Sequence, residues 1–474
     1  MTSAVRSLAV AWLVFALLWE GAWAQSSGSK PPSGSGGQAS GAKAQFDQLF
    51  KQFKDLLGEI RQLQLEYKRV KPAQRPPIEQ AFQEKTTKAR QMLARLKQLA
   101  EEVFRSDPSQ KEIALFLAVA ATQANRRGDL AEAVRLFELL ESKGFRFEEP
   151  ERNREMDALA GQAAFQYGRY DLAEKFLTRA KGGNEKPPAP VEQILAQLPR
   201  EKELWAQEQK FREEEAKRGD DDPQALPRVL LHTTKGDIVI ELFEDQAPNT
   251  VANFIYLVEK GFYDGLTFHR VLPGFVAQGG DPKGDGSGGP GYTIPDEHNR
   301  KDARRHYWGS VAMAHTGKAN SAGSQFYIAY KRLPALDGSY TVFGRVIQGM
   351  DVAVRLNPQN PQDKQKKLPP DRILSARVLR KRKHPYVPKV LRPGSSEPVP
   401  VEGGADSGKE KPQQQEAGKE KESGSPRKPF PLKAPSPKTS PPRKDSPQAR
   451  PPAGKETAKP QPKPPKPAGE KSPP

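Results

Sequence analysis

The residue types that most often carry chemistry are unevenly represented in this chain. It has no cysteine, so thiol nucleophiles, disulfides and cysteine-zinc sites are excluded. Its six histidines (232, 269, 298, 306, 315 and 384) form no pair at metal-ligand spacing, and we expect neither a metal nor a cofactor. The glycines between residues 279 and 289 lack the Lys-Ser/Thr and the strand-to-helix context of a phosphate-binding loop. Close backbone approach explains them better.

Three blocks of sequence instead combine an arginine with aromatic and amide side chains. Residues 268–281 read FHRVLPGFVAQGGD, residues 313–328 begin with MAH and end with GSQFYI, and residues 336–344 contain LDG and VFG. A single arginine flanked by aromatic residues is usually a surface ion-pair residue. Here Arg270 occurs together with Phe275, Gln278 and Gln325, and the three blocks span only about 75 residues. We therefore interpret them as parts of one site.

In order and spacing, these blocks make the chain resemble the cyclophilins, a family of peptidyl-prolyl cis-trans isomerases. The resemblance covers roughly a third of the chain. It implies a catalytic set of Arg270, Gln278 and Phe275. It also implies that the substrate is bound by Val276, Gly286, Ala314, His315, Gln325, Tyr327, Leu336 and Tyr340. The chain departs from the best-known members at Ala335, where they carry Trp, and at Tyr340, where they carry His.

These residue types suit the rotation of a prolyl bond. An Xaa-Pro amide isomerises slowly because resonance gives its C–N bond double-bond character, with a barrier of about 18–20 kcal/mol. A catalyst need only favour the twisted state, in which the prolyl nitrogen becomes a hydrogen-bond acceptor. Arginine can serve because it is always charged and presents several donors in a rigid fork. The substrates expected from the resemblance are proteins that contain Xaa-Pro bonds.

Two other classes of function remain open at this stage. The first is a cyclophilin-like binding module in a scaffold protein that acts through its helical region. The second is a nucleic-acid-binding protein, suggested by a net charge of +18 and a sequence pI near 9.7. Nucleic acid is the less favoured partner, because the basic C-terminal segment has no interleaved aromatic residues on which bases could stack.

The elements that would position the site residues are mainly strands. Residues 229–234 and 237–243 alternate β-branched residues around Lys235-Gly236, which predicts a β-hairpin. Residues 249–260 and 350–356 predict two helices, and residues 372–379 predict a last strand. Many short strands with only two helices favour a closed, mainly-β barrel capped by helices, cyclophilin-like, over residues 224–386.

An all-α region is predicted before this barrel. Apolar residues at steps of three and four predict two long helices from Phe46 to Val70 and from Ile78 to Val103, separated by a break at residues 72–77. Residues 128–133 (GDLAEA) and 168–173 (GRYDLA) then lie 40 residues apart. Each begins with a turn glycine and ends with an alanine, Ala133 or Ala173, that predicts a close approach of two helices. This echo resembles tetratricopeptide repeats, although an ordinary helical bundle remains an alternative. We expect a helical, tetratricopeptide-like domain at residues 44–186 that binds a protein partner, followed by a charged helical spacer at residues 187–223 with a solvated face.

The two ends of the chain differ in character from both of these regions. Arg6, an uncharged apolar run from Leu8 to Leu18, and Ala22-Trp23-Ala24 predict a signal peptide at residues 1–24, and hence export to a periplasm or cell envelope. Residues 25–43 are interpreted as a flexible Ser/Gly linker. Residues 387–474 are interpreted as a disordered basic tail rich in Pro and Lys. An anionic envelope polymer or lipid is the partner expected for this tail.

Overall fold

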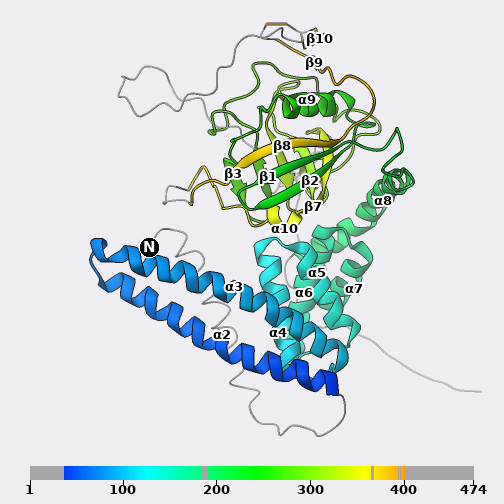
Figure 1. Ribbon diagram of the computed structural model, residues 1–474. Coiled ribbons are helices and arrows are strands. Elements are labelled where there is room, and N and C mark those ends of the chain that lie inside the picture. Colours follow the sequence, from blue (N-terminus) through cyan, green and yellow to red (C-terminus); the bar gives the residue numbers. More distant parts are fainter. Residues whose placement is uncertain (1–36, 183–189, 364–367, 393, 396, 402–474) are drawn as a thin grey trace, which may run out of the picture. The chain divides into compact units, whose positions relative to one another are not determined.

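A computed structural model describes residues 37–182, 190–363, 368–392, 394–395 and 397–401 (Figure 1). The predicted signal peptide and the tail beyond residue 401 lie outside the described residues. Helices dominate the described part up to residue 216 and strands the part after it, as the sequence predicts. None of the helices in these ranges has both the length and the apolar character that a membrane span requires.

The two long helices predicted at the start lie side by side as a hairpin (Figure 1). They are α2 (Gly37–Arg69) and α3 (Arg75–Ser106), joined by a 3-10 turn at Pro72–Gln74. Pro76 and Pro77 belong to the first turn of α3, where the missing N–H costs no helical hydrogen bond. The linker predicted for residues 25–43 is wrong for its last seven residues, because α2 begins at Gly37. Ala42 is buried there and Lys43 pairs with Asp47 one turn on.

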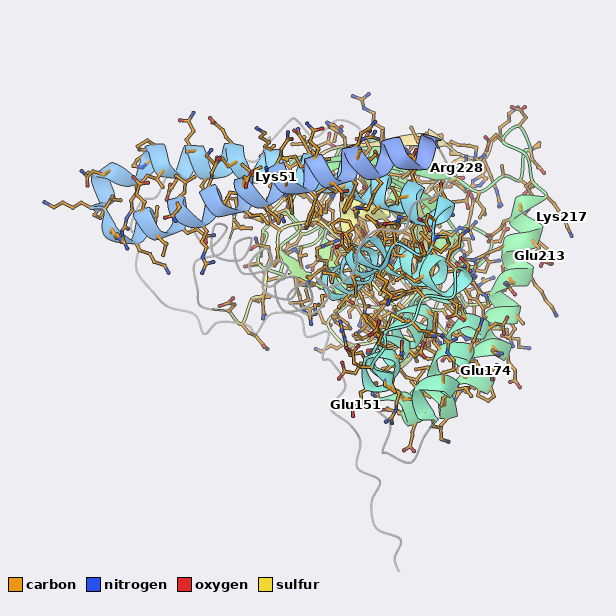
Figure 2. The ribbon with its side chains drawn as sticks, turned by 90° about the horizontal axis from the view of Figure 1, so that it is seen from below. Lys51, Glu151, Glu174, Glu213, Lys217 and Arg228 are labelled. Carbon is orange, nitrogen blue, oxygen red and sulfur yellow. The ribbon has the colours of Figure 1, made fainter. Side chains whose placement is uncertain are left out.

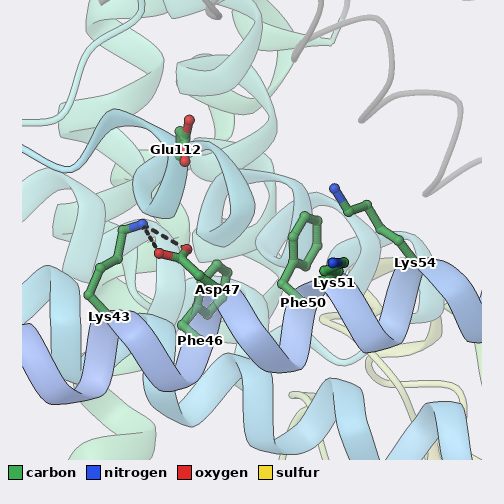
Figure 3. Close-up of a pocket in the computed structure, with 7 residues that line it drawn as sticks. All are labelled: Lys43, Phe46, Asp47, Phe50, Lys51, Lys54 and Glu112. Atoms are coloured by element: carbon green, nitrogen blue, oxygen red, sulfur yellow. Dashed lines mark hydrogen bonds and ion pairs between the residues drawn. The ribbon is translucent and has the colours of Figure 1, made fainter. Parts of the chain in front are cut away.

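Aromatic packing joins α2 to α4 (Lys111–Arg127). The rings of Phe46 and Phe50 stack with centroids 5.6 Å apart, and Phe116 of α4 meets both of them edge-on. The charged residues around these rings form a hollow, shown in Figure 3, that is lined by Lys43, Phe46, Asp47, Phe50, Lys51, Lys54 and Glu112.

The 40-residue echo corresponds to a repeated helix pair. The pairs are α4 with α5 (Leu130–Ser142), and α6 (Pro150–Tyr167) with α7 (Tyr170–Lys181). Gly128 and Gly168 end the first helix of each pair with φ of 80° and 96°, a conformation that strongly favours glycine. Ala133 and Ala173 are fully buried at matching positions, as the echo predicts for a close approach of helices.

Helix α8 (Val191–Ala216) corrects the prediction that the spacer has a solvated face. Glu213 and Lys217 do lie at the exposed outer edge (Figure 2). Glu201 and Glu208, however, are each only 5% exposed. Their partners are two buried arginines from the strand-rich part of the chain: Arg332 binds Glu201, and Arg304 binds Glu208. The pattern of charges along α8 alone could not reveal these partners.

The strand-rich part forms one curled antiparallel sheet of eight strands. Its spatial order is β3-β4-β6-β5-β7-β2-β1-β8. The strands are β1 (Arg228–Thr233), β2 (Gly236–Leu242), β3 (Arg270–Leu272), β4 (Val276–Gly279), β5 (Ser310–Met313), β6 (Phe326–Ala329), β7 (Val342–Gln348) and β8 (Ile373–Arg380). The predicted hairpin is confirmed as β1 and β2 around Lys235. Strands β3 and β8 are the two edges of this sheet and do not pair with each other, so the predicted closed barrel is instead a curled half-barrel. The segments just before these strands meet in an isolated bridge between Thr267 and Arg372.

Two helices accompany the sheet, as predicted. Helix α9 (Pro248–Glu259) packs against β8, and the short α10 (Met350–Ala353) packs against β2. Phe254 of α9 and Phe268, Phe326 and Phe343 from the sheet side belong to one fully buried apolar core. This core fixes the sheet that carries the site residues.

The tail predicted to begin at residue 387 is wrong for its first described residues. Strands β9 (Lys389–Val390) and β10 (Val399–Pro400) pair with each other, and Leu391 bridges to Thr293. Val390 and Leu391 are buried against the main body of the chain, which gives these residues the apolar contacts that order them.

Candidate active site

Arg270 and Gln278 lie opposite each other on neighbouring strands. Strands β3 and β4 pair so that Arg270 faces Gln278, and side chains opposite each other in an antiparallel pair lie on the same face of the sheet. The turn between the strands contains Gly274, with φ of 68°, and Phe275. The guanidinium carbon of Arg270 lies 5.8 Å from the centroid of the Phe275 ring. The three residues of the predicted catalytic set are therefore adjacent.

Burial affects the charge at this position. It lowers the pKa of Arg270, while Tyr340 acts in the opposite direction. Because a guanidinium loses its proton only in strong base, Arg270 stays charged near neutral pH despite this lowering of its pKa. A charged donor fork at the edge of an apolar surface is less screened than one in water, so each hydrogen bond that it makes there is stronger.

A ladder of amides holds the neighbouring loop. Gln278 donates through Nε2 to Oε1 of Gln325 at 2.9 Å, and Gln325 donates to the carbonyls of Gly286 and Gly288 at 3.0 and 2.9 Å. The Asp281 carboxylate accepts from the backbone N–H of Gly286 at 2.5 Å. The structure thus brings together three of the predicted site residues, Gln278, Gln325 and Gly286. Their hydrogen bonds fix the wall of the site on this side.

Six of the predicted residues share one apolar cluster. Val276, Ala314, Tyr327 and Leu336 are buried in it, and Phe275 and Tyr340 are partly buried against it. Leu336 comes from a 3-10 turn, Pro334–Leu336, that follows β6 by four residues. The other five residues come from four separate segments, so this cluster exists only in the folded chain. A partly exposed apolar surface beside Arg270 is suited to a small apolar ring.

His315 supports Tyr340 rather than offering a free imidazole. The two rings stack with centroids 4.2 Å apart and planes within 18°. The Nδ1 atom of His315 accepts from the N–H of Gly317 at 3.0 Å, which leaves Nε2 to donate to the carbonyl of Ser339 at 2.7 Å. His315, predicted to bind substrate, is therefore hydrogen-bonded within the protein at both ring nitrogens.

His306 and Asp337 were not predicted as site residues, yet His306 contacts Tyr327 and Asp337 contacts His306. His306 is fully buried, and its Nε2 lies 2.8 Å from the hydroxyl of Tyr327. Its Nδ1 lies 3.0 Å from Oδ1 of Asp337. One signal could have found them: a tyrosine inside an apolar cluster needs a partner for its hydroxyl. The sequence did not say which residue that partner would be.

Comparison with known proteins gives consistent matches for the strand-rich part. Residues 228–378 match the family model described as cyclophilin type peptidyl-prolyl cis-trans isomerase/CLD. A peptidyl-prolyl cis-trans isomerase of Synechococcus elongatus is 46% identical over 154 residues, which are 32% of this chain and 97% of that protein. Peptidyl-prolyl cis-trans isomerase B of Bacillus subtilis is 52% identical over 120 residues, 25% of this chain and 82% of the other.

Solved structures match the same share of the chain. A crystal structure of a cyclophilin type peptidyl-prolyl cis-trans isomerase from Cryptosporidium parvum is 34% identical. The match covers 33% of this chain and 99% of the other, with a TM-score of 0.29.

Proposed function

Since this chain belongs to the cyclophilin-type peptidyl-prolyl cis-trans isomerases, we propose a mechanism in which Arg270 promotes rotation of an Xaa-Pro bond. The proline ring rests on the partly exposed Phe275, with Val276, Tyr327 and Leu336 buried directly behind it in the same apolar cluster. As the amide twists and loses conjugation, the prolyl nitrogen gains a lone pair, and the Arg270 guanidinium donates a hydrogen bond to it. This bond is stronger in the twisted state than in either planar isomer, which is the condition for catalysis.

The amide ladder has a separate role in this proposal. Gln278, held by Gln325, hydrogen bonds a carbonyl next to the prolyl bond and so prevents the peptide from turning as a whole. Rotation is then confined to the C–N bond. The observation that carries the proposal is the register of β3 and β4, which sets Arg270 opposite Gln278 and beside Phe275 at the edge of the apolar cluster.

Replacement of Arg270 by alanine tests the mechanism. We expect kcat/KM of Arg270→Ala on an Ala-Pro peptide, measured by NMR exchange, to fall about ten- to a hundredfold, because a charge-assisted hydrogen bond in the twisted state contributes about 1.5–3 kcal/mol. Lys331→Ala is the matched control. Its Nζ lies 6.0 Å from the same Phe275 ring, so the variant removes one positive charge from the same neighbourhood. A wild-type rate in Arg270→Ala, or an equal loss in both variants, would contradict the assignment.

We also propose that the substrates are exported proteins and that the helical region, as a tetratricopeptide-like module, binds them or a partner protein. The support for export is the N-terminal pattern of Arg6, the apolar run and Ala22-Trp23-Ala24. N-terminal sequencing of the protein purified from its native cells should find Gln25 as the first residue. A protein that begins at Met1 would contradict removal of a signal peptide.

A further inference from the structure

A series of buried polar side chains leads away from the hydroxyl of Tyr327. The first is His306, whose Nε2 lies 2.8 Å from that hydroxyl, and the second is Asp337, whose Oδ1 lies 3.0 Å from His306 Nδ1. Burial acts to raise the pKa of Asp337, but the hydrogen bond from His306 and the charge of Arg332 lower it, so the carboxylate is ionised. It can only accept, so Nδ1 of His306 donates to it and the Tyr327 hydroxyl donates to Nε2.

Arg332 connects this pair to the helical region. Its Nη2 lies 2.6 Å from Oδ2 of Asp337, and its Nε donates to Oε2 of Glu201 at 2.7 Å. Its Nη1 donates to the carbonyl of His306 at 3.0 Å. The side chain is 1% exposed, so these bonds form away from water and restrict the guanidinium to one position. We call His306, Asp337, Arg332 and Glu201 the polar chain.

Glu201 belongs to α8, and further contacts of the helices support the same two segments of the sheet domain. The backbone N–H of Arg332 donates to the carbonyl of Gln166 in α6 at 3.0 Å. Next to His306, Tyr307 packs edge-on against Trp205 of α8, with ring centroids 4.8 Å apart. The segments that carry the polar chain are thus held by the helical region at several points.

A second buried pair on α8 shows that burial of a charge does not by itself lead to the site. Glu208, two turns after Glu201, binds Arg304 at 2.7 and 2.8 Å. The other side-chain bonds of Arg304 go to Glu215 and Gln246. The two glutamates lie on one helix face, are equally buried, and each binds its own buried arginine. In the described part of the chain, hydrogen bonds lead from Glu201 to Tyr327, whereas Arg304 meets the apolar cluster through its stacking over the Phe243 ring at 3.8 Å.

We propose that His306 and Asp337 are positioning residues for the proline-binding surface, and that α8 holds them through Arg332 and Glu201. This rests on the proposed function, in which the proline contacts the partly exposed side of the apolar cluster and the buried Tyr327 ring supports that side from within. A tyrosine hydroxyl buried without its acceptor would move to find another, and the ring would move with it. Small displacements of a substrate-positioning surface are costly for catalysis. The helical region is therefore a supporting part of the isomerase site.

A double-mutant cycle on the full chain tests this inference. Glu201→Gln should lower kcat/KM on an Ala-Pro peptide about three- to thirtyfold, the range typical of residues that couple two sites. Tyr327→Phe keeps the ring but removes the hydroxyl at which the polar chain ends. In that background Glu201→Gln should cost less than about twofold. Glu208→Gln is the matched control and should leave kcat/KM within about twofold of wild type while lowering the Tm. Equal losses from Glu201→Gln in both backgrounds would overturn the proposal.

A readout without turnover separates this inference from the proposed function. In protein with labelled tyrosine, the ring resonances of Tyr327, assigned by their loss in Tyr327→Phe, should shift in Glu201→Gln and stay unchanged in Glu208→Gln. If Glu201→Gln does not fold, Glu201→Asp replaces it, since it keeps the charge but shortens the side chain. Unchanged Tyr327 resonances would overturn the inference even in an active enzyme. A chain without isomerase activity whose Tyr327 resonances shift would contradict only the proposed function.

Discussion

At the scale of single residues, the site depends on where each hydrogen-bonding group finds a partner. Arg270, Phe275 and Gln278 could be predicted because all three stand within nine consecutive residues. His306 could not, because its two partners lie 21 and 31 residues away and only the fold brings them together. A local motif predicts the residues that meet the substrate. It does not predict the residues that hold them in place.

Burial of His306 should make the protein acid-sensitive. Burial lowers its pKa below the usual 6.5, and Asp337 only partly opposes this. The unfolded chain then binds more protons as the pH falls through about 6.5, so the free energy of unfolding should decrease by about 1.4 kcal/mol per unit of pKa lowering. The pKa of His269 is lowered by burial too, and its contribution has the same sign.

Urea unfolding between pH 7.5 and 5.5 measures this effect. His306→Gln should unfold more easily at pH 7.5 but lose less stability on acidification than the wild type. Protonation of Asp337 does not contribute between pH 7.5 and 5.5, because its pKa is lowered from the usual 3.8 and the carboxylate binds a proton only in stronger acid. Identical pH dependence in the two proteins would show that His306 does not cause the sensitivity.

At the scale of elements, the helix pairs depend on close approach. A Cβ atom added to Gly161 in α6 would lie 2.5 Å from Cγ of Leu177 in α7, and 3.2 Å from its backbone nitrogen. We expect Gly161→Ala to lower the free energy of unfolding by about 1–3 kcal/mol, because the backbone contact leaves no room for the clash to relax. Circular dichroism at 222 nm during urea unfolding would measure it.

Gly58 in α2 is the matched control for this substitution. It is also a helical glycine, but nothing lies within 4 Å of a Cβ added there. Gly58→Ala should stabilise the protein by about 0.5–1 kcal/mol through helix propensity alone. If Gly161→Ala is as stable as Gly58→Ala, the two helices are not in the close contact described.

The prediction for α8 shows why some elements are harder to interpret than others. The sequence predicts a helix there, and α8 is one. Glu201, Glu208 and Glu215 recur every seven residues, which places them on one face of the helix. That face would normally be solvated. It is buried because Arg332 and Arg304 lie opposite Glu201 and Glu208 in space. In the sequence these partners are 131 and 96 residues apart, so the local pattern of charges cannot predict the pairs.

At the scale of the molecule, the helical region and the sheet domain share buried contacts. Tyr307, from the segment before β5, belongs to the core of the helical region. Gly128, in the first repeated turn, would bring an added Cβ within 3.2 Å of Gly274, next to Phe275. The sequence suggests two domains joined by a spacer. These contacts instead indicate that the described helices and the sheet stabilise each other.

This mutual dependence predicts a single unfolding transition. The described part of the chain contains two tryptophans, and both lie at contacts between the helices and the sheet domain. The ring of Trp205 in α8 lies 4.8 Å from that of Tyr307, and the ring of Trp308 lies 5.0 Å from that of Tyr167 in α6. Their fluorescence should report the loss of this interface. Circular dichroism at 222 nm should report the helices. We expect the two signals to change at the same urea concentration.

The buried pair of Arg304 and Glu208 provides the mutational test. Their side chains are 0% and 6% exposed. Burial acts to raise the pKa of Glu208, but Arg304 lowers it overall, so the carboxylate stays charged. Arg304→Met should lower the free energy of unfolding by about 3 kcal/mol, because it leaves that charge buried with only the more exposed Arg212. Adding Glu208→Met should recover most of the loss, since an apolar pair can replace a buried ion pair, and Glu215 keeps Arg345 as its partner.

In both variants the fluorescence and dichroism transitions should move together. Transitions that separate, with the fluorescence changing first, would mean that the helices and the sheet fold independently and meet only afterwards.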